Sequence, residues 1–177
     1  MGHPRMLTPR ILWFALFVSQ FLYLGMLLMP GVVPPGQVPE PVLAYAIAPV
    51  ALAAAVASFV VPRMLAQAAF AAGAALETRP MEGKVASAGY RSALGAREFA
   101  DREEALRIAV QRGFAPFILR LALNESVALF GFVLGYLGHP LTVWLPFFVV
   151  SWTMMAFRFP TERGLLRPLA KANGIDP

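Results

Sequence analysis

The sequence predicts an all-α integral membrane protein with four transmembrane helices in two hairpins and a cytoplasmic helical segment between the second and third helices. Three observations predict this fold. First, 58% of the 177 residues are hydrophobic and only 14% are charged. A soluble domain carries about 25% charged residues, so this chain has more apolar side chains than the core of one soluble domain can bury. Second, the apolar residues form four long runs. Third, four membrane crossings place nearly all basic residues on one side of the membrane.

The first apolar run, Ile11 to Met29, holds no charged residue and is long enough to cross a bilayer. A signal peptide would have a shorter apolar core and a small-residue cleavage site, whereas this run ends in Met29-Pro30-Gly31. We therefore expect a retained helix. The next segment, Pro30 to Pro41, has five prolines and no Lys or Arg, which predicts an extended external loop.

The second run, Val42 to Val61, is uncharged and rich in alanine, and it closes with Pro62-Arg63. Helix formers from Met64 to Thr78 predict that this helix continues beyond the membrane until Arg79-Pro80 breaks it. Apolar residues recur at roughly helical spacing among the charges of Glu82 to Gln111. This pattern predicts an amphipathic helix, whose charged side chains face water or, as the alternative, bind anionic lipid headgroups.

The third and fourth runs are joined by the short turn Gly138–Pro140, which makes the two helices antiparallel neighbours. The predicted segments, in chain order, are an N-terminal arm (1–10), a first span (11–29), an external loop (30–41), a second span (42–61), a cytoplasmic segment (62–113), a third span (114–137), an external turn (138–140), a fourth span (141–157) and a cytoplasmic tail (158–177).

The 15 basic residues determine the predicted orientation. The two external segments have no Lys or Arg, and nearly all basic residues lie in segments that four spans place on one side. The positive-inside rule makes that side cytoplasmic, with both termini inside. Trp13 and Trp144 lie near span ends, as an interfacial aromatic belt predicts. Arg outnumbers Lys thirteen to two, which favours a bacterial inner membrane protein from a GC-rich genome. The net charge of +5 thus indicates topology and not binding to nucleic acid.

Several kinds of chemistry are excluded or disfavoured by composition. The chain has no cysteine, which rules out disulfides, thiolate metal sites and cysteine nucleophiles. His3 and His139 are too far apart in sequence to form a metal-binding motif, and no glycine-rich phosphate loop is present. We therefore predict no catalytic residue, no metal site and no cofactor, and we do not expect an enzyme.

Glu125 is the residue most suggestive of function. It lies about eleven residues into the third run, which is about 17 Å at 1.5 Å per residue and close to the bilayer centre. A carboxylate at that depth must be paired, protonated or hydrated. Arg120 lies about 140° round the helix from Glu125, so we expect it to reach toward the cytoplasmic surface instead.

Counting along the other runs places polar groups at the same depth as Glu125. Ser19, Gln20 and Tyr23 reach it in the first run and Ser151 to Thr153 in the fourth. The residues that we predict to bind H⁺ or Na⁺ are the carboxyl and four neutral neighbours: Glu125, Asn124, Ser126, Thr153 and Gln20. The alternative is a protonated Glu125 whose hydrogen bond to Thr153 or Gln20 only holds helices together, worth about 0.6 kcal/mol.

Small residues spaced four apart predict close helix packing. Gly131 and Gly135 form a G-x-x-x-G pattern in the third run, and Ala44 and Ala48 repeat the theme in the second. These faces favour a tight bundle, a homo-oligomer or docking to other membrane subunits.

The stretch Leu121-Ala122-Leu123-Asn124-Glu125-Ser126 and the glycine-containing apolar residues after it resemble the carboxylate-bearing helix of rotary ATP synthase c subunits. The resemblance covers residues 119–137. It implies that Glu125 is an ion-binding carboxylate for a proton or sodium ion, with Ser126 as a co-ligand. The chain lacks the glycine-repeat partner helix and the Arg-(Gln/Asn)-Pro loop of that family, so the resemblance is local.

Two functions follow from these observations. The first is a small inner-membrane protein that serves as an accessory or structural subunit of a bacterial membrane complex, with the lipid bilayer and other membrane subunits as its partners. The alternative is an ion-coupled membrane protein in which Glu125 binds H⁺ or Na⁺. The first predicts that Glu125→Gln is silent, and the second predicts that it abolishes function.

Overall fold

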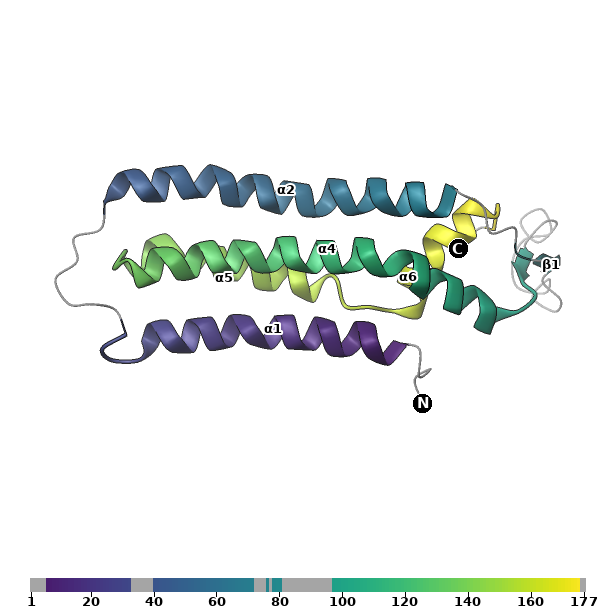
Figure 1. The fold of residues 1–177 in the computed structure, drawn as a ribbon, viewed down its shortest axis with the longest axis horizontal. Helices are drawn as coiled ribbons and strands as arrows, with labels where there is room; N and C mark the ends of the chain where they lie inside the picture. Colours follow the sequence, from purple (N-terminus) through teal and green to yellow (C-terminus); the bar gives the residue numbers. More distant parts are fainter. Residues whose placement is uncertain (1–5, 33–39, 72–75, 77, 81–96, 176–177) are drawn as a thin grey trace, which may run out of the picture. The chain divides into compact units, whose positions relative to one another are not determined.

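The structure, a computed structural model, describes residues 6–32, 40–71, 76, 78–80 and 97–175. Within these ranges the chain is mainly helical, with one pair of short strands. In chain order the elements are α1 (Leu7–Leu28), α2 (Pro41–Ala71), β1 (Thr78–Pro80), β2 (Arg97–Phe99), α4 (Arg102–Tyr136), α5 (Leu141–Ala156) and α6 (Glu162–Ala172), labelled in Figure 1.

The chain forms two compact units, which we name by their composition. The apolar unit comprises Thr8–Arg63 and Ala115–Phe159. The polar unit comprises Met1–Leu7, Met64–Phe114 and Pro160–Pro177. The helices α2 and α4 each contribute residues to both units.

Three helices, α1, α2 and α4, are long and apolar enough to cross a membrane, with 22, 31 and 35 residues. They confirm the prediction of a helical chain with apolar helices long enough to cross a membrane. The fourth apolar helix, α5, has 16 residues. At 1.5 Å per residue it is about 24 Å long, shorter than the hydrocarbon thickness of about 30 Å.

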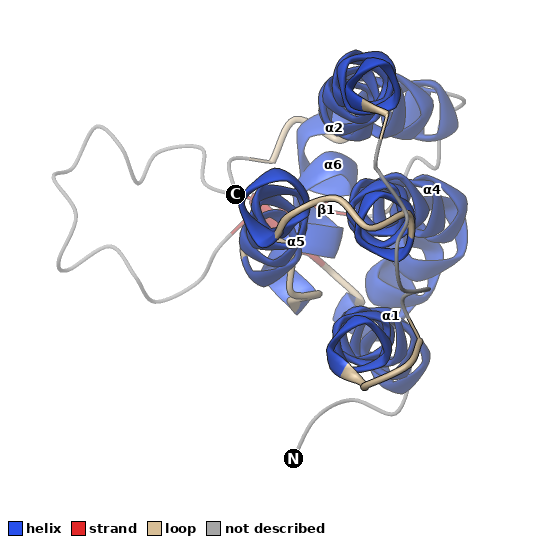
Figure 2. Ribbon diagram, turned by 90° about the vertical axis from the view of Figure 1, so that its left-hand side faces the viewer, coloured by secondary structure: helices blue, strands red, loops and turns tan. Residues whose placement is uncertain are grey.

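In the apolar unit, α1, α5 and parts of α2 and α4 run side by side, as the end-on view of Figure 2 shows. Its main core cluster joins all four helices through the buried side chains Leu27, Ala128, Leu134, Trp144 and Phe148 and partly buried neighbours that include Tyr23, Ala44 and Ile47. A second cluster, of Phe117, Leu121 and Met155, packs against Leu12, Trp13, Leu16 and Phe17 of α1. The Trp13 indole Nε1–H also donates to the Met155 carbonyl at 3.0 Å.

Burial is unequal among these helices. In the most apolar 18-residue stretch of α1 and of α2 only 11% of residues are buried inside the protein, against 39% in α4. Large apolar side chains such as Leu22, Val42 and Leu52 are more than 60% exposed. Lipid would cover such surfaces without the cost that water imposes, and α4 is the helix with the most protein around it.

The two glycines of the G-x-x-x-G pattern pack inside the chain. A Cβ at Gly131 would lie 2.8 Å from the Phe147 Cβ and 3.0 Å from the Trp144 carbonyl oxygen of α5. A Cβ at Gly135 would lie 2.6 Å from a Leu27 methyl group. This small-residue face is therefore occupied by α5 and α1. Ala44 also packs on the main core cluster, whereas Ala48 is exposed.

Local signals explain where α4 begins and ends. The Asp101 carboxylate accepts hydrogen bonds from the backbone N–H groups of Glu103 and Glu104 at 2.9 and 3.0 Å, as an N-cap residue does. At the other end Gly138 adopts φ +82°, a left-handed conformation that glycine reaches at little cost. The chain therefore turns within a few residues from α4 into α5.

The polar unit has its own apolar cluster, in which Phe70 of α2, Ala105 and Ala109 of α4 and Leu169 of α6 are buried. The α6 N-cap is Thr161, whose Oγ1 accepts from the Gly164 N–H at 3.1 Å. The strands β1 and β2 pair antiparallel, with Thr78 opposite Phe99.

The structure partly corrects the helical segment predicted over 62–113. The second helix does pass Arg63, but it ends at Ala71, and Arg97–Phe99 is a strand. Helix α4 begins at Arg102, so the last part of this segment and the third apolar run form one helix. The physical reason is that the paired strands β1 and β2 satisfy each other's backbone hydrogen-bonding groups. A search for apolar residues at helical spacing does not detect such a pair. Of the amphipathic helix predicted over Glu82 to Gln111, residues 82–96 lie outside the described residues, and residues 102–111 are helical as the first part of α4.

Candidate functional site

Helix α4 supplies polar side chains to two separate clusters in the apolar unit. Adjacent residues of an α-helix point about 100° apart, so Asn124 and Glu125 face different neighbours. The Glu125 side chain bonds to α1, whereas the Asn124 side chain bonds to Met155 of α5 and to Arg158, just beyond the end of α5. These two directions define a carboxyl cluster and an arginine cavity.

The carboxyl cluster consists of Glu125, Ser19 and Tyr23. The Ser19 Oγ lies 2.7 Å from Glu125 Oε1, and the Tyr23 hydroxyl lies 2.9 Å from the same oxygen. Ser19 and Tyr23 are four residues apart on α1 and so share one helix face. The Ser19 Oγ is also 2.9 Å from the Leu16 carbonyl oxygen.

The hydrogen bonds of Oε1 suit Glu125 either ionised or protonated. An ionised Oε1 accepts from both hydroxyl groups. A protonated Oε1 donates to the Ser19 Oγ, Ser19 donates to the Leu16 carbonyl, and Tyr23 still donates to Oε1. Oε1, the Ser19 hydroxyl and the Tyr23 hydroxyl therefore each keep a hydrogen-bond partner in either state.

The other residues of the predicted ion-binding set lie elsewhere. The Asn124 amide bonds to Arg158 and Met155, and the Ser126 Oγ donates to the Leu123 carbonyl at 2.8 Å. Thr153 is exposed, and its hydroxyl donates to the Val149 carbonyl at 2.7 Å. These hydroxyl groups bond within their own helices because serine and threonine readily donate to a carbonyl one turn earlier.

Gln20 is fully buried, and neither its amide nitrogen nor its amide oxygen has a hydrogen-bond partner among the described residues. Depth counting along the sequence had grouped Gln20 with Ser19 and Tyr23. The structure brings Ser19 and Tyr23, but not Gln20, into hydrogen bonds with Glu125. The α1 periodicity accounts for this, because Gln20 lies about 100° from Ser19 around the helix.

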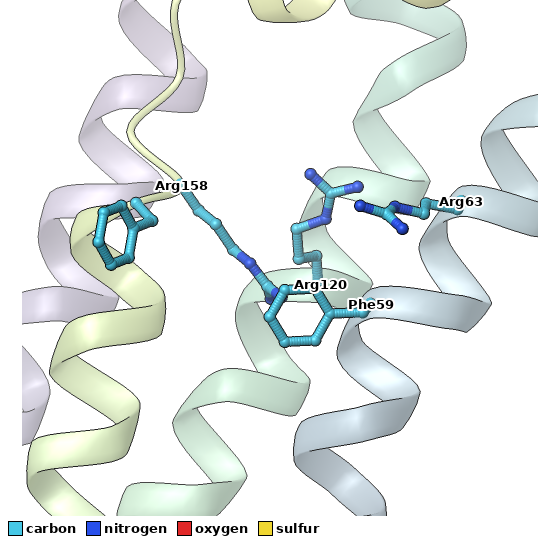
Figure 3. A pocket seen from close by; sticks show the side chains of 5 residues that line it. Phe59, Arg63, Arg120 and Arg158 are labelled. Atoms are coloured by element: carbon cyan, nitrogen blue, oxygen red, sulfur yellow. The ribbon is translucent and has the colours of Figure 1, made fainter.

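The arginine cavity lies in the same unit and has a volume of about 210 Å³. Its lining consists of three arginines and two aromatic rings: Phe59 and Arg63 of α2, Arg120 of α4, and Phe157 and Arg158, which follow α5. Figure 3 shows the Arg63 and Arg120 guanidinium groups side by side, with Arg158 reaching across toward Phe59.

Arg158 is held in this cavity by specific contacts. Its Nη1 donates to the Asn124 Oδ1 at 2.7 Å and to the Ser58 Oγ at 3.2 Å. Its guanidinium carbon lies 4.0 Å from the centre of the Phe59 ring, a cation–π contact. Ser58 and Asn124 are themselves fully buried, so neutral oxygens and an aromatic face hold this cation.

The charges that line the cavity are all positive. No carboxylate is among the five lining residues, and the ion pairs Arg102–Glu162 and Arg107–Glu104 lie in the polar unit. Burial, and after it the charges of Arg120 and Arg63, lowers the pKa of Arg158 to about 10. That value is still well above 7, so Arg158 remains charged at neutral pH.

Sequence analysis missed this cavity as a site. It treated the arginines one by one, as topology markers or as a side chain reaching for the surface. A signal was present, however: Arg63 and Arg158 each close an apolar run, and Arg120 lies near the same end of another. Helices that bring those ends to one level also bring the arginines together.

No group of three metal-binding side chains occurs among the described residues. His139 is buried, with its Nε2 unpaired in the described part of the chain. No protein-family model matches the chain, and no curated protein or solved structure is similar to it. The function must therefore be argued from the two clusters themselves.

Proposed function

We propose that this chain is a four-span bacterial inner-membrane protein, with both termini in the cytoplasm, in which Glu125 binds a proton near the middle of the membrane. The observation that supports proton binding is the carboxyl cluster, in which the hydrogen bonds of Oε1 suit both protonation states. The resemblance of residues 119–137 to the ion-binding helix of c subunits points in the same direction.

A proton fits this cluster better than a sodium ion does. A sodium ion needs several oxygen ligands around it, whereas a proton needs one acceptor and a relay. The hydroxyl groups that hydrogen-bond to Glu125 Oε1 are those of Ser19 and Tyr23, and Ser19 is also bonded to the Leu16 carbonyl. We therefore favour H⁺ over Na⁺ as the bound ion.

The packing of α5 supports the proposed fourth span and the arrangement in two hairpins. Its early residue Trp144 lies close to Gly135, and its late residue Ser151 donates to the Asn124 carbonyl at 2.7 Å. This order of contacts is that of antiparallel neighbours. Although α5 is short for a span, it packs on α4 and α1 and five of its side chains are buried by protein. It therefore depends less on lipid contact than α1 and α2 do.

The proton-binding proposal is tested by labelling with dicyclohexylcarbodiimide, which reacts with protonated carboxyl groups in apolar surroundings. The chain and its Glu125→Gln variant are reconstituted in liposomes and labelled across a pH series, with and without Na⁺. We expect labelling of Glu125 that falls as pH rises and that Na⁺ leaves unchanged. Tyr23→Phe removes one donor to Oε1 and should shift the pH dependence, and Glu40→Gln, at an exposed carboxyl outside the cluster, is the matched control.

Each outcome has a defined meaning. Suppression of labelling by Na⁺ would replace the proton with sodium as the bound ion. Absence of Glu125 labelling at every pH would reject ion binding and leave the hydrogen bonds of Glu125 as a structural link between α1 and α4.

The second candidate function is an accessory or structural subunit of a larger membrane complex. It is favoured by α2, which leaves most of its apolar surface uncovered, including Tyr45 at 79% exposure. A photo-crosslinking residue at Tyr45 in native membranes should then capture a defined partner, whereas only lipid adducts would count against it. In this case Glu125→Gln should leave assembly unchanged.

The proposed orientation is directly measurable, because the chain has no cysteine and single-cysteine variants need no background removal. Glu40→Cys and Lys171→Cys place thiols at exposed positions before α2 and on α6. A membrane-impermeant maleimide should label Glu40→Cys in intact spheroplasts and Lys171→Cys only after permeabilisation. Labelling of both in intact spheroplasts would reject the four-span topology.

A further inference from the structure

The arginine cavity combines concentrated positive charge with unused hydrogen-bond donors. The guanidinium groups of Arg63, Arg120 and Arg158 line one space of about 210 Å³ without a lining carboxylate. Like charges placed together repel, and partial burial removes part of the water that would screen them. A cluster of this kind is unfavourable while empty, and an anion would offset that cost.

Two buried donors of the arginines that line the cavity have no acceptor among the described residues. They are the Nε of Arg120 and the Nη2 of Arg158. A guanidinium group presents five N–H donors in a fixed plane, and a buried donor without a partner costs free energy. Arg158 is nevertheless fixed through its other nitrogen by Asn124 and Ser58. The Nη2 of Arg158 is therefore held at a fixed position in the lining of the cavity.

We propose that this cavity binds a phosphate group, carried either by a lipid headgroup or by a soluble molecule. Phosphate offers several acceptor oxygens and up to two negative charges, which suits three guanidinium groups better than a single carboxylate would. Holding one water takes only about 10–15 Å³ of such space, so the cavity has room for a phosphate and for part of what it is attached to. The inference is independent of proton binding at Glu125.

The lining also suggests where the rest of the ligand lies. Phe59 and Phe157 provide apolar surface beside the arginines, and Phe157 is 87% exposed. A ligand with a phosphate and an apolar or organic substituent could contact both. Arg63 and Arg158 lie two residues and one residue beyond the ends of predicted spans, the level at which lipid phosphates lie.

The test compares charge removal inside and outside the cavity. Arg63→Gln and Arg120→Gln each remove one lining charge, and neither side chain is among the described hydrogen bonds that hold the helices together. Arg158 is left intact because it bonds to buried Asn124 and Ser58. Arg167→Gln, at an exposed position of α6, removes the same charge from the polar unit and is the matched control.

The full-length chain in a neutral detergent is titrated with two probes, and binding is measured by the rise of the thermal unfolding midpoint. One probe is inorganic phosphate against chloride at equal ionic strength. The other is phosphatidylglycerol against phosphatidylcholine in mixed micelles, with bound lipid counted by native mass spectrometry. Each variant is first shown to unfold at or above the wild-type midpoint without probe. If Arg120→Gln fails this control, Arg63→Gln, at an exposed residue, is used alone.

We expect at least tenfold weaker binding of the effective probe in Arg63→Gln and Arg120→Gln, and a change of less than twofold in Arg167→Gln. Binding of phosphate alone identifies a soluble ligand, and retention of phosphatidylglycerol identifies a lipid headgroup. The proposal is overturned if neither probe binds, or if Arg167→Gln weakens binding as much as the cavity variants do.

Discussion

Replacing Gly131 by alanine tests the packing of α4 against α5. In the structure the added Cβ would lie 2.8 Å from the Phe147 Cβ and 3.0 Å from the Trp144 carbonyl oxygen. Neither atom can move by a side-chain rotation, since one is a Cβ and the other belongs to the backbone. Helix α5 itself must therefore shift away from α4.

The size of the effect follows from two opposing terms. Overpacking a close contact costs about 1–3 kcal/mol, and contact with immobile atoms places Gly131→Ala in the upper part of that range. Alanine is a better helix former than glycine by up to about 1 kcal/mol, which offsets part of the cost. We expect a net loss of about 1–2 kcal/mol, or a midpoint lower by about 2–8 °C for a chain of this size.

Two other helical glycines form a graded series with Gly131. Gly25 of α1 has nothing within 4 Å of an added Cβ, so Gly25→Ala should be neutral or stabilising. At Gly135 the nearest atoms are the methyl groups of Leu27, the flexible end of a side chain, so Gly135→Ala should fall between the other two.

Thermal unfolding of the three variants in one detergent, followed by circular dichroism, measures this order. Size-exclusion chromatography with light scattering of the same samples reports the oligomeric state. If Gly131→Ala is as stable as Gly25→Ala, or if it changes the oligomeric state without changing stability, the packing of Gly131 on α5 is refuted and the face serves an intermolecular contact instead.

Three further predictions concern single contacts, each measured by the same unfolding assay. Arg158→Met should destabilise the chain by about 1–3 kcal/mol, because the buried Asn124 amide loses its cationic donor. Combining it with Asn124→Leu should recover part of the loss, and additive effects of the two substitutions would contradict the contact. Trp13→Phe should cost about 0.5–1.5 kcal/mol through the lost bond to the Met155 carbonyl, and an unchanged midpoint would count against that bond. Phe70→Ala should cost about 3–5 kcal/mol in the polar unit and expose it to limited proteolysis, which a wild-type cleavage pattern would disprove.

Much of the carboxyl cluster could be inferred from the chain alone. The position of Glu125 in an apolar run marked it as unusual, and counting residues placed Ser19 and Tyr23 at its depth. Depth does not specify direction around a helix, however. The same counting favoured Gln20 and Thr153, which the structure places away from the described bonds of Glu125.

The limits of sequence inference are clearest where side chains from distant segments meet. Hydropathy and charge determined that the chain has long apolar helices, because these properties depend on composition over some twenty residues. Which faces meet was decided by tertiary packing, through contacts such as Gly131 on α5 and Leu27 on Gly135. That packing turns Asn124 toward Arg158 and Glu125 toward α1. It also brings Arg63, Arg120 and Arg158 into one cavity, since a rotation of a helix about its axis changes every partner while leaving its hydropathy unchanged.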